Sequence, residues 1–187
     1  MKKLMFWVFV TLLLAVAVHI ATVLMIPRLE GGARVSRAMS GGDLNQLTVL
    51  KSEEEAQRVL GIANPDLVYA VCPFDITQRP IIISAQVPDR YWSMSVYAED
   101  GSTLYTLNDQ QAGVQAFVAE LRLDSESSLV PSQTVQGNSE SLVIRSAFER
   151  GVVIFRAFAG ETALQQRARE QLAQTRCSTN RASAGLN

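Results

Sequence analysis

Residues 91–97 read YWSMSVY, a run in which large apolar side chains alternate with small polar ones. Successive side chains of a strand point to opposite faces of a sheet, so this alternation is typical of a half-buried antiparallel strand. We expect Trp92, Met94 and Val96 to share the buried face. This strand decides the fold class, because similar short runs lie on both sides of it.

Other short runs rich in Val, Ile, Tyr and Phe are separated by turns that contain Gly, Pro, Asn or Asp. These runs are residues 67–72, 81–87, 103–107, 116–123, 141–145 and 152–159, with a first short strand expected at 46–50. Short strands at near-regular spacing are typical of a sandwich or barrel. No long amphipathic helix lies between them to form parallel crossovers. We therefore predict a mainly β (α+β) domain with an antiparallel sandwich, spanning residues 46–177.

Two helices are expected within this domain. Ser52 and Glu55 form a capping-box pattern before a two-turn helix at 53–60, which Gly61 would end. Residues 161–176 have a narrow apolar stripe at helical spacing, which predicts a C-terminal helix packed on the sheet. Residues 178–187 are small and polar, and we expect a disordered tail there.

The N-terminal residues 4–26 read LMFWVFVTLLLAVAVHIATVLMI, with no formal charge. As a helix they would be about 35 Å long, enough to cross a hydrocarbon core of about 30 Å. We expect a transmembrane signal-anchor at 1–26 that Pro27 ends. Residues 27–45, with two Gly-Gly pairs, would then form a membrane-proximal linker with a short helix near 33–39.

A cleaved secretory signal is the alternative to an anchor. Lys2 and Lys3 would be its basic region, and Ala15-Val16-Ala17 its cleavage site. The apolar run continues for nine residues past Ala17, which favours the anchor. Basic residues flank the run on both sides, so their count does not favour a cytoplasmic N-terminus. We still expect that orientation, because a short basic region before a long apolar run behaves as a signal-anchor.

His19 is the one strongly polar side chain in the apolar run. A polar group in lipid is costly and usually faces a partner. Ala17 and Ala21 form a small-xxx-small pair, which we place near the same face, and the three residues predict a contact with another membrane helix. Alternatively, a neutral His19 bonds a backbone carbonyl or reaches towards the interface.

Composition excludes several classes of function. The chain has 187 residues, a formal net charge of −1 and a single histidine. Nucleic-acid binding is disfavoured, because it requires a basic surface. One histidine inside the apolar run leaves no Ser-His-Asp, Cys-His or histidine-ligated zinc site. The sequence also lacks Walker, G-x-G-x-x-G, G-x-S-x-G and EF-hand patterns. We expect no metal and no cofactor, and whether the protein is an enzyme stays open.

Cys72 and Cys177 are the two cysteines of the chain. Outside the cytoplasm an even number permits a disulfide, which would tie the C-terminal helix to an early strand. The alternative is two free, buried thiols that act as small apolar groups.

Polar residues gather at the predicted turns, and they offer the one candidate ligand cluster. Its members are Asn64, Asp66, Tyr69, Asp89 and Tyr91. If they converged in one cleft, a carboxylate with a raised pKa could act in acid–base chemistry. The simpler interpretation is structural, because Asn and Asp bond their own backbone in turns.

Several of these segments together carry a resemblance to a known family. They are Asn64-Pro65-Asp66-Leu67-Val68-Tyr69, Phe74-Asp75-Ile76, Arg79-Pro80, Asp89-Arg90-Tyr91-Trp92-Ser93-Met94 and Tyr105-Thr106-Leu107-Asn108-Asp109. The chain resembles the bacterial domain-of-unknown-function family 1254, above all a short membrane-anchored branch. It departs from the family at Gln78-Arg79, where a glycine usually precedes the proline.

The resemblance implies a jelly-roll-like fold in the bacterial envelope. Family members often occur beside, or fused to, a second uncharacterised β domain of family 1214. No activity is established for the family, so it implies no catalytic residues. We expect a single-pass protein of the bacterial inner membrane with a periplasmic domain that associates with another envelope protein, such as one with a family 1214 domain. The alternative is a ligand-binding or enzymatic domain that uses the turn cluster.

Overall fold

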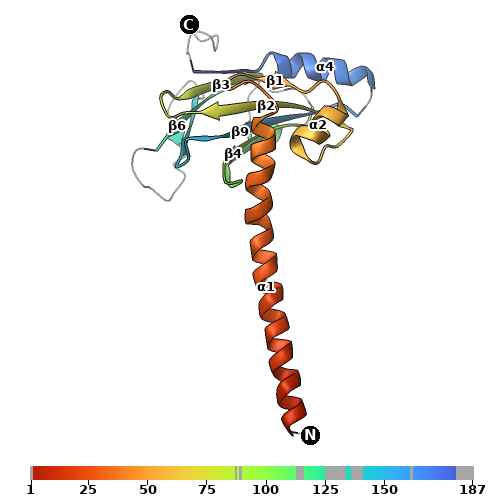
Figure 1. Cartoon of the computed structure of the whole chain (residues 1–187). Coiled ribbons are helices and arrows are strands. Elements are labelled where there is room, and N and C mark those ends of the chain that lie inside the picture. The colour runs from red at the N-terminus through yellow and green to blue at the C-terminus, as the bar shows by residue number, and fades with distance from the viewer. Residues whose placement is uncertain are drawn as a thin grey trace.

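The structure is a computed structural model of the chain. It describes residues 2–86, 88, 90–112, 116–124, 134–135, 141–160 and 162–179. Most of the expected disordered tail, residues 180–187, lies outside the described residues. A long helix carries at one end a domain of two packed sheets (Figure 1). The predicted fold class is confirmed.

The first sheet, sheet A, is antiparallel throughout. Its strand order is β1 (Thr48–Val49), β2 (Leu67–Asp75), β9 (Arg150–Phe158), β4 (Trp92–Ala98) and β5 (Thr103–Asn108). The predicted strands at 67–72, 91–97, 103–107 and 152–159 are all in this sheet. The long β2–β9 pair at its centre joins segments that are far apart in sequence.

The second sheet, sheet B, is mixed. Its strand order is β10 (Arg176–Ser178), β3 (Ile81–Gln86), β6 (Ala116–Leu123), β8 (Ser141–Ser146) and β7 (Thr134–Val135). β6 and β8 run parallel, which departs from the expected antiparallel pattern. The connection between them includes β7, which turns back to pair antiparallel with β8.

In the described part of the chain, four helices accompany the sheets. They are α1 (Lys2–Met39), α2 (Glu53–Leu60), α3 (Asp109–Ala112) and α4 (Thr162–Ala173). The predicted cap of α2 is confirmed: Ser52 Oγ accepts the Glu55 N–H at 3.2 Å, and Gly61 ends the helix with φ 78°. The C-terminal helix ends at Ala173, earlier than the predicted 176, and Cys177 lies on the strand β10 that follows it.

The main core lies between the two sheets. Trp92, Met94 and Val96 all point into it and are fully buried, as their alternation predicts. Ser93 and Ser95 on the other face are also buried, so the expectation of a half-buried strand is wrong. The Trp92 ring packs edge-on against Phe117 of sheet B, with ring centroids 5.3 Å apart. Such aromatic pairs add to the free energy gained from apolar burial. This core fixes the inner face of sheet A against sheet B.

A disulfide between Cys72 and Cys177 crosses this core. The predicted bridge is therefore present. It joins β2 of sheet A to β10 of sheet B, rather than to the C-terminal helix itself. A disulfide persists in an oxidising compartment, so it is consistent with an extracytoplasmic domain.

A second apolar cluster lies on the outer face of sheet A, where α1 packs on β2 and β9. Val35 and Ala38 of α1 are 5% and 1% exposed. They meet Val71 of β2 and Val152 of β9. The helix thus explains why β2 is buried on both faces, in the pattern of an almost continuous apolar run.

The expectation that Pro27 ends the first helix is wrong. Of the expected linker over 27–45, residues 27–39 belong to this helix, which includes the short helix expected near 33–39, and residues 40–45 lie outside it. The backbone stays helical through Pro27 to Met39. A proline disfavours a helix interior because it lacks an N–H and crowds the preceding turn. Here the next residues gain tertiary contacts that outweigh this cost, since Val35 and Ala38 are buried on sheet A.

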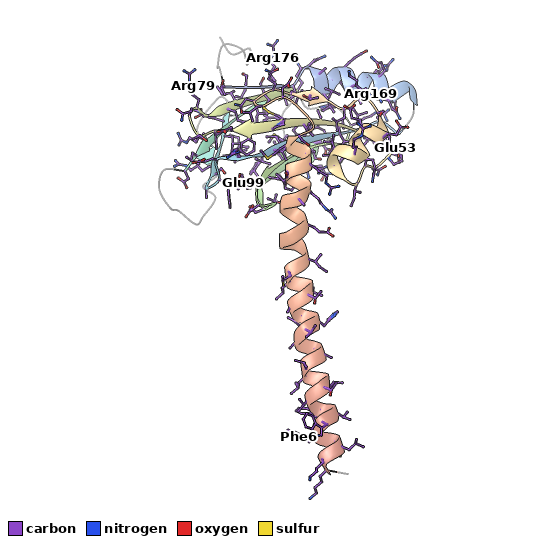
Figure 2. The ribbon with its side chains drawn as sticks, viewed as in Figure 1. Phe6, Glu53, Arg79, Glu99, Arg169 and Arg176 are labelled. Carbon is purple, nitrogen blue, oxygen red and sulfur yellow. A yellow bond between two sulfur atoms is a disulfide. The ribbon has the colours of Figure 1, made fainter. Side chains whose placement is uncertain are left out.

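The first part of α1 has no such partners. Figure 2 shows side chains on all sides of the helix where it leaves the domain, with Phe6 near its far end and 62% exposed. In the part of the chain that the structure describes, α1 is the one helix long and apolar enough to cross a membrane. Its length and composition suit a signal or an anchor.

Candidate functional site

Three members of the predicted turn cluster lie together before and within β2. Asn64 Oδ1 accepts the Asp66 N–H at 2.9 Å, which forms an Asx turn. The Asn64 N–H donates to the Tyr69 hydroxyl oxygen at 2.9 Å. The Asp66 carbonyl accepts the Ala159 N–H at 2.8 Å. These groups hold the entry of β2, as the structural interpretation of the cluster expects.

The other two members come from the segment before β4. Asp89 lies outside the described residues. Tyr91 is 49% exposed, and its hydroxyl donates to Ser93 Oγ at 3.3 Å. The Tyr91 carbonyl accepts the Phe158 N–H at 2.9 Å, and β9 separates this segment from β2. Of the described members, the structure joins Asn64, Asp66 and Tyr69, and sets Tyr91 apart.

A groove lies beside α1 on the outer face of sheet A. This groove has a volume of about 380 Å³. Its floor is Tyr69 of β2, Ile154 and Arg156 of β9, and Tyr97 of β4. Its size is that of a small-molecule site.

The walls of the groove come from the helices and from one turn. Arg34, Val35 and Ala38 of α1 line it, together with Leu60 and Ile62 around the end of α2. Gly31 and Gly101 close the end where the β4–β5 turn touches α1. A Cβ on Gly101 would overlap the Gly31 backbone, and its φ of 89° suits glycine.

The charged lining of the groove is basic. Arg34 and Arg156 line it, and no carboxylate does among the described residues. Arg34 forms an ion pair with Glu30 at 2.6 Å on the exposed side of α1. Arg156 is half-buried and donates to Ser95 Oγ at 3.1 Å. Within the described ranges no acidic side chain lies at ion-pair distance from Arg156.

Sequence reasoning found Tyr69 in this groove and missed Arg156, Tyr97 and Ile62. One signal for Arg156 was present, because it follows the apolar run Val152–Phe155 within a predicted strand. A charged residue inside such a run suggests a special environment. The helix wall had no signal, because Pro27 predicted a linker in that region.

The shifted pKa values lie outside the groove. The pKa of Asp75 is lowered from its usual 3.8, first by the hydrogen bond from the Thr77 side chain and next by the one from the Thr77 backbone. The Thr77 hydroxyl is 2.6 Å from Asp75 Oδ1. Burial raises the pKa of Tyr105 on β5. Neither shift marks a catalytic group in the groove.

The predicted helix contact of Ala17, His19 and Ala21 falls on two faces of α1. All three side chains are exposed on a continuous helix. At about 100° per residue, His19 lies roughly 160° around the helix from each alanine. Residues two apart do not share a face, so the expectation of a single face is corrected. His19 and the alanine pair are separate candidate contacts.

Within the described ranges, no group of three or more His, Cys, Asp or Glu residues could hold a metal ion. The groove, with its aromatic and aliphatic lining and two arginines, is instead suited to an apolar molecule that carries a negative charge.

Two solved structures are similar to the chain. The VPA0106 protein from Vibrio parahaemolyticus has a TM-score of 0.58 at 16% identity, over 83% of this chain and 37% of that chain. A putative uncharacterized protein from Burkholderia cenocepacia has a TM-score of 0.43 at 11% identity, over 64% of this chain and 32% of that chain. The first likeness supports the fold alone, and this chain spans well under half the length of either.

No curated protein matches the chain. The family described as protein of unknown function (DUF1254) matches residues 44–179, which include both sheets and α4. This match covers most of the chain and agrees with the resemblance carried by the turn segments. The chain therefore belongs to the DUF1254 family.

Proposed function

We propose that this protein is a single-pass anchor of the bacterial inner membrane whose periplasmic domain acts by association with another envelope protein. The observation that carries the proposal is the continuity of α1. Its first part is apolar and exposed, and its last part is packed on sheet A. An uncleaved helix of this kind would hold the domain at a fixed place above the bilayer.

Continuity also supports an anchor over a cleaved signal. Cleavage after Ala17 would leave the apolar residues 18–26 attached to the packed end of the helix. Val18, Ile20 and Leu24 are all more than half exposed, at 57%, 52% and 63%. A soluble product would present this apolar surface to water, which is unfavourable. The disulfide supports a periplasmic place for the domain.

Two surfaces are candidates for the association. One is the membrane helix, with His19 on one side and Ala17 and Ala21 on the other. The second is an aromatic patch formed by Tyr91 and Phe158, which are 49% and 38% exposed beside each other at one end of sheet A. Aromatic residues are enriched at protein interfaces. A protein with a family 1214 domain is a candidate partner, because the family resemblance implies that pairing.

Purification of the full chain from membranes tests the anchor and the association together. Intact mass distinguishes the uncleaved chain from one that lacks residues 1–17. Protease treatment of spheroplasts should degrade residues 40–187 from outside. In mild detergent, a stoichiometric partner should co-purify. A cleaved, soluble product or protection until lysis would overturn the anchor, and a monomer with no partner would overturn the association.

Single substitutions can locate the contact within the membrane helix. His19→Leu removes the polar group, and Ala21→Leu fills the small-residue face on the other side. Ile20→Leu is the matched control, because it keeps apolar character and size between the two faces. Partner recovery should fall for one of the first two variants and stay unchanged for the control. Equal recovery for all three would place the contact on the domain, where Phe158→Ala tests it.

A further inference from the structure

The Arg156 side chain has a position that the proposed association does not explain. It lies near the C-terminal end of β9, opposite Tyr69 on one side and Ser93 on the other. Its neighbours two residues away on the same face include the buried Ile154. A half-buried arginine costs free energy unless charged or polar groups compensate it. The Ser95 hydroxyl is the one partner found for it among the described residues.

Tyr69 adds an unused donor beside this arginine. Its hydroxyl oxygen accepts the Asn64 N–H at 2.9 Å, so its own O–H can point elsewhere. Among the described residues no hydrogen bond donated by that O–H is found beside the one that the oxygen accepts. Tyr69 is 6% exposed and lines the groove next to Arg156. Two adjacent donors on the floor therefore lack an anionic acceptor.

Most of the remaining groove lining is apolar, apart from Arg34 and the Tyr97 side chain. Val35, Ala38, Leu60 and Ile154 surround the two donors, and Arg34 lies at the side. Ligand sites typically combine such a lining with a few convergent polar groups. Arginine binds carboxylate and phosphate groups with charge-assisted hydrogen bonds. We propose that the groove binds a small amphipathic anion, which has an apolar body and one carboxylate or phosphate group held by Arg156 and Tyr69.

Such an anion can come from solution or from the bilayer. The helix residues that line the groove begin at Gly31, about 8 Å along the axis from Ile26 at a rise of 1.5 Å per residue. If α1 spans a membrane, this end of the groove lies near the lipid headgroups. The binding chemistry is the same for both sources. The groove itself does not depend on the proposed anchor, so the two proposals can fail separately.

The test uses the full chain in phosphatidylcholine nanodiscs, which avoids detergents that could occupy the groove. Octanoate is the probe, and octanol is its uncharged match. Calorimetric titration, with empty nanodiscs subtracted, should show saturable binding of one octanoate and at least tenfold weaker binding of octanol. Absence of saturable octanoate binding, or equal binding of the two, would overturn the proposal.

Two pairs of variants assign the binding to the groove. Arg156→Gln should weaken octanoate binding at least tenfold, whereas Arg167→Gln on the exposed side of α4 should leave it unchanged. Ile62 is 66% exposed at the rim, so substitutions there spare the fold. Ile62→Asp should weaken binding at least threefold more than Ile62→Asn, because only the first adds a negative charge. If the two variants of each pair change octanoate affinity equally, octanoate does not bind in the groove. If Arg156→Gln does not fold, the comparison of Ile62→Asp with Ile62→Asn alone decides whether the groove is the binding site.

Phosphatidylglycerol then distinguishes the sources. Nanodiscs that contain this anionic lipid should abolish octanoate binding if the groove takes a membrane lipid. Unchanged octanoate affinity supports a soluble anion in the same groove. In both cases Arg156→Gln must remove the preference for octanoate over octanol. If the variant keeps this preference, Arg156 does not bind the anionic group.

Discussion

The two faces of sheet A are covered in different ways. Sheet B closes the inner face with a continuous core and a disulfide. On the outer face, α2 and the last part of α1 cover β2 and β9 and leave a groove. The inner face therefore holds the fold together from within the domain. The cover of the outer face depends on a helix that continues into the exposed apolar segment.

Removal of the disulfide is the largest expected effect, and it tests the inner face. Cys72 and Cys177 are 105 residues apart, and both are buried. For a loop of about 100 residues the chain-entropy estimate is roughly 4–5 kcal/mol. We expect the double change Cys72→Ala and Cys177→Ala to lower the free energy of unfolding by about 4 kcal/mol. Urea unfolding measures it, and reduced wild type is the control. A loss of less than about 1 kcal/mol would mean that the core alone closes this face.

A charge under α1 tests the outer face. Ala38 is 1% exposed against sheet A, and Ala33 on the same helix is exposed. An uncompensated buried charge costs about 3–5 kcal/mol. We expect Ala38→Asp to release the end of α1 while the disulfide-closed sandwich stays folded. Hydrogen exchange should show lost protection in residues 31–39 for Ala38→Asp, and near-wild-type protection for Ala33→Asp. Equal exchange in both variants would contradict the packing of α1.

The glycine contact between α1 and the β4–β5 turn predicts that Gly101→Ala and Gly32→Ala change the stability in opposite directions. A Cβ on Gly101 would overlap Gly31, and a non-glycine residue at positive φ costs roughly 1–3 kcal/mol. The nearest atom to a Cβ on Gly32 is 3.5 Å away, an ordinary contact. Replacing a helical glycine with alanine stabilises by roughly 0.5–1 kcal/mol. We expect Gly101→Ala to weaken docking of α1 and Gly32→Ala to strengthen it, as measured by thermal unfolding. The same sign for both would contradict this contact.

The inner face could be predicted from sequence, because its signals are local. Alternation in residues 91–97 identified the side of β4 that faces sheet B. Cys72 and Cys177 permitted a bridge. The mixed pairing in sheet B had no local signal, because the parallel partners β6 and β8 are chosen by tertiary packing.

The outer face could not be predicted from the same kind of signal. Pro27 locally disfavours a helix, and the contacts that keep α1 intact come from β2 and β9, far away in sequence. Because the sequence predicted that the helix ends at Pro27, it gave no sign of the part of α1 that lines the groove. The turn cluster identified Tyr69 for the wrong reason, since its place in the groove comes from its register opposite Arg156.

Removal of the N-terminal cap of α2 tests a smaller contribution to the packing on the outer face of sheet A. Ser52 Oγ accepts the Glu55 N–H, and the Glu55 carboxylate accepts the Lys51 N–H at 2.7 Å. Loss of such a cap costs about 1 kcal/mol. We expect Ser52→Ala to destabilise the domain by about that amount, measured by urea unfolding. Ser36→Ala, an exposed change on α1, is the control and should be close to neutral. An equally small effect of both would show that α2 is held by packing alone.

The smallest expected effect is at the end of β2, where the connection from α1 meets sheet A through a hydrogen bond from the Asp75 N–H to Asn45 Oδ1 at 3.0 Å. Hydrogen bonds from Thr77 lower the pKa of Asp75 below 3.8. The ionised carboxylate therefore stabilises the folded state above the unfolded pKa, and this contribution is lost as the pH falls through the lower folded pKa.

Thr77→Val should raise the folded pKa of Asp75 towards its usual value by removing the hydroxyl donor. At neutral pH we expect a loss of about 0.5–1 kcal/mol in the free energy of unfolding. The difference from wild type should shrink as the pH falls below about 4, because protonation removes the same interaction from both proteins. Urea unfolding across this range measures it, with the exposed Thr103→Val as control. If the difference in the free energy of unfolding stays constant with pH, the effect comes from packing of Thr77. The Asp75 carboxylate would then not stabilise this end of β2.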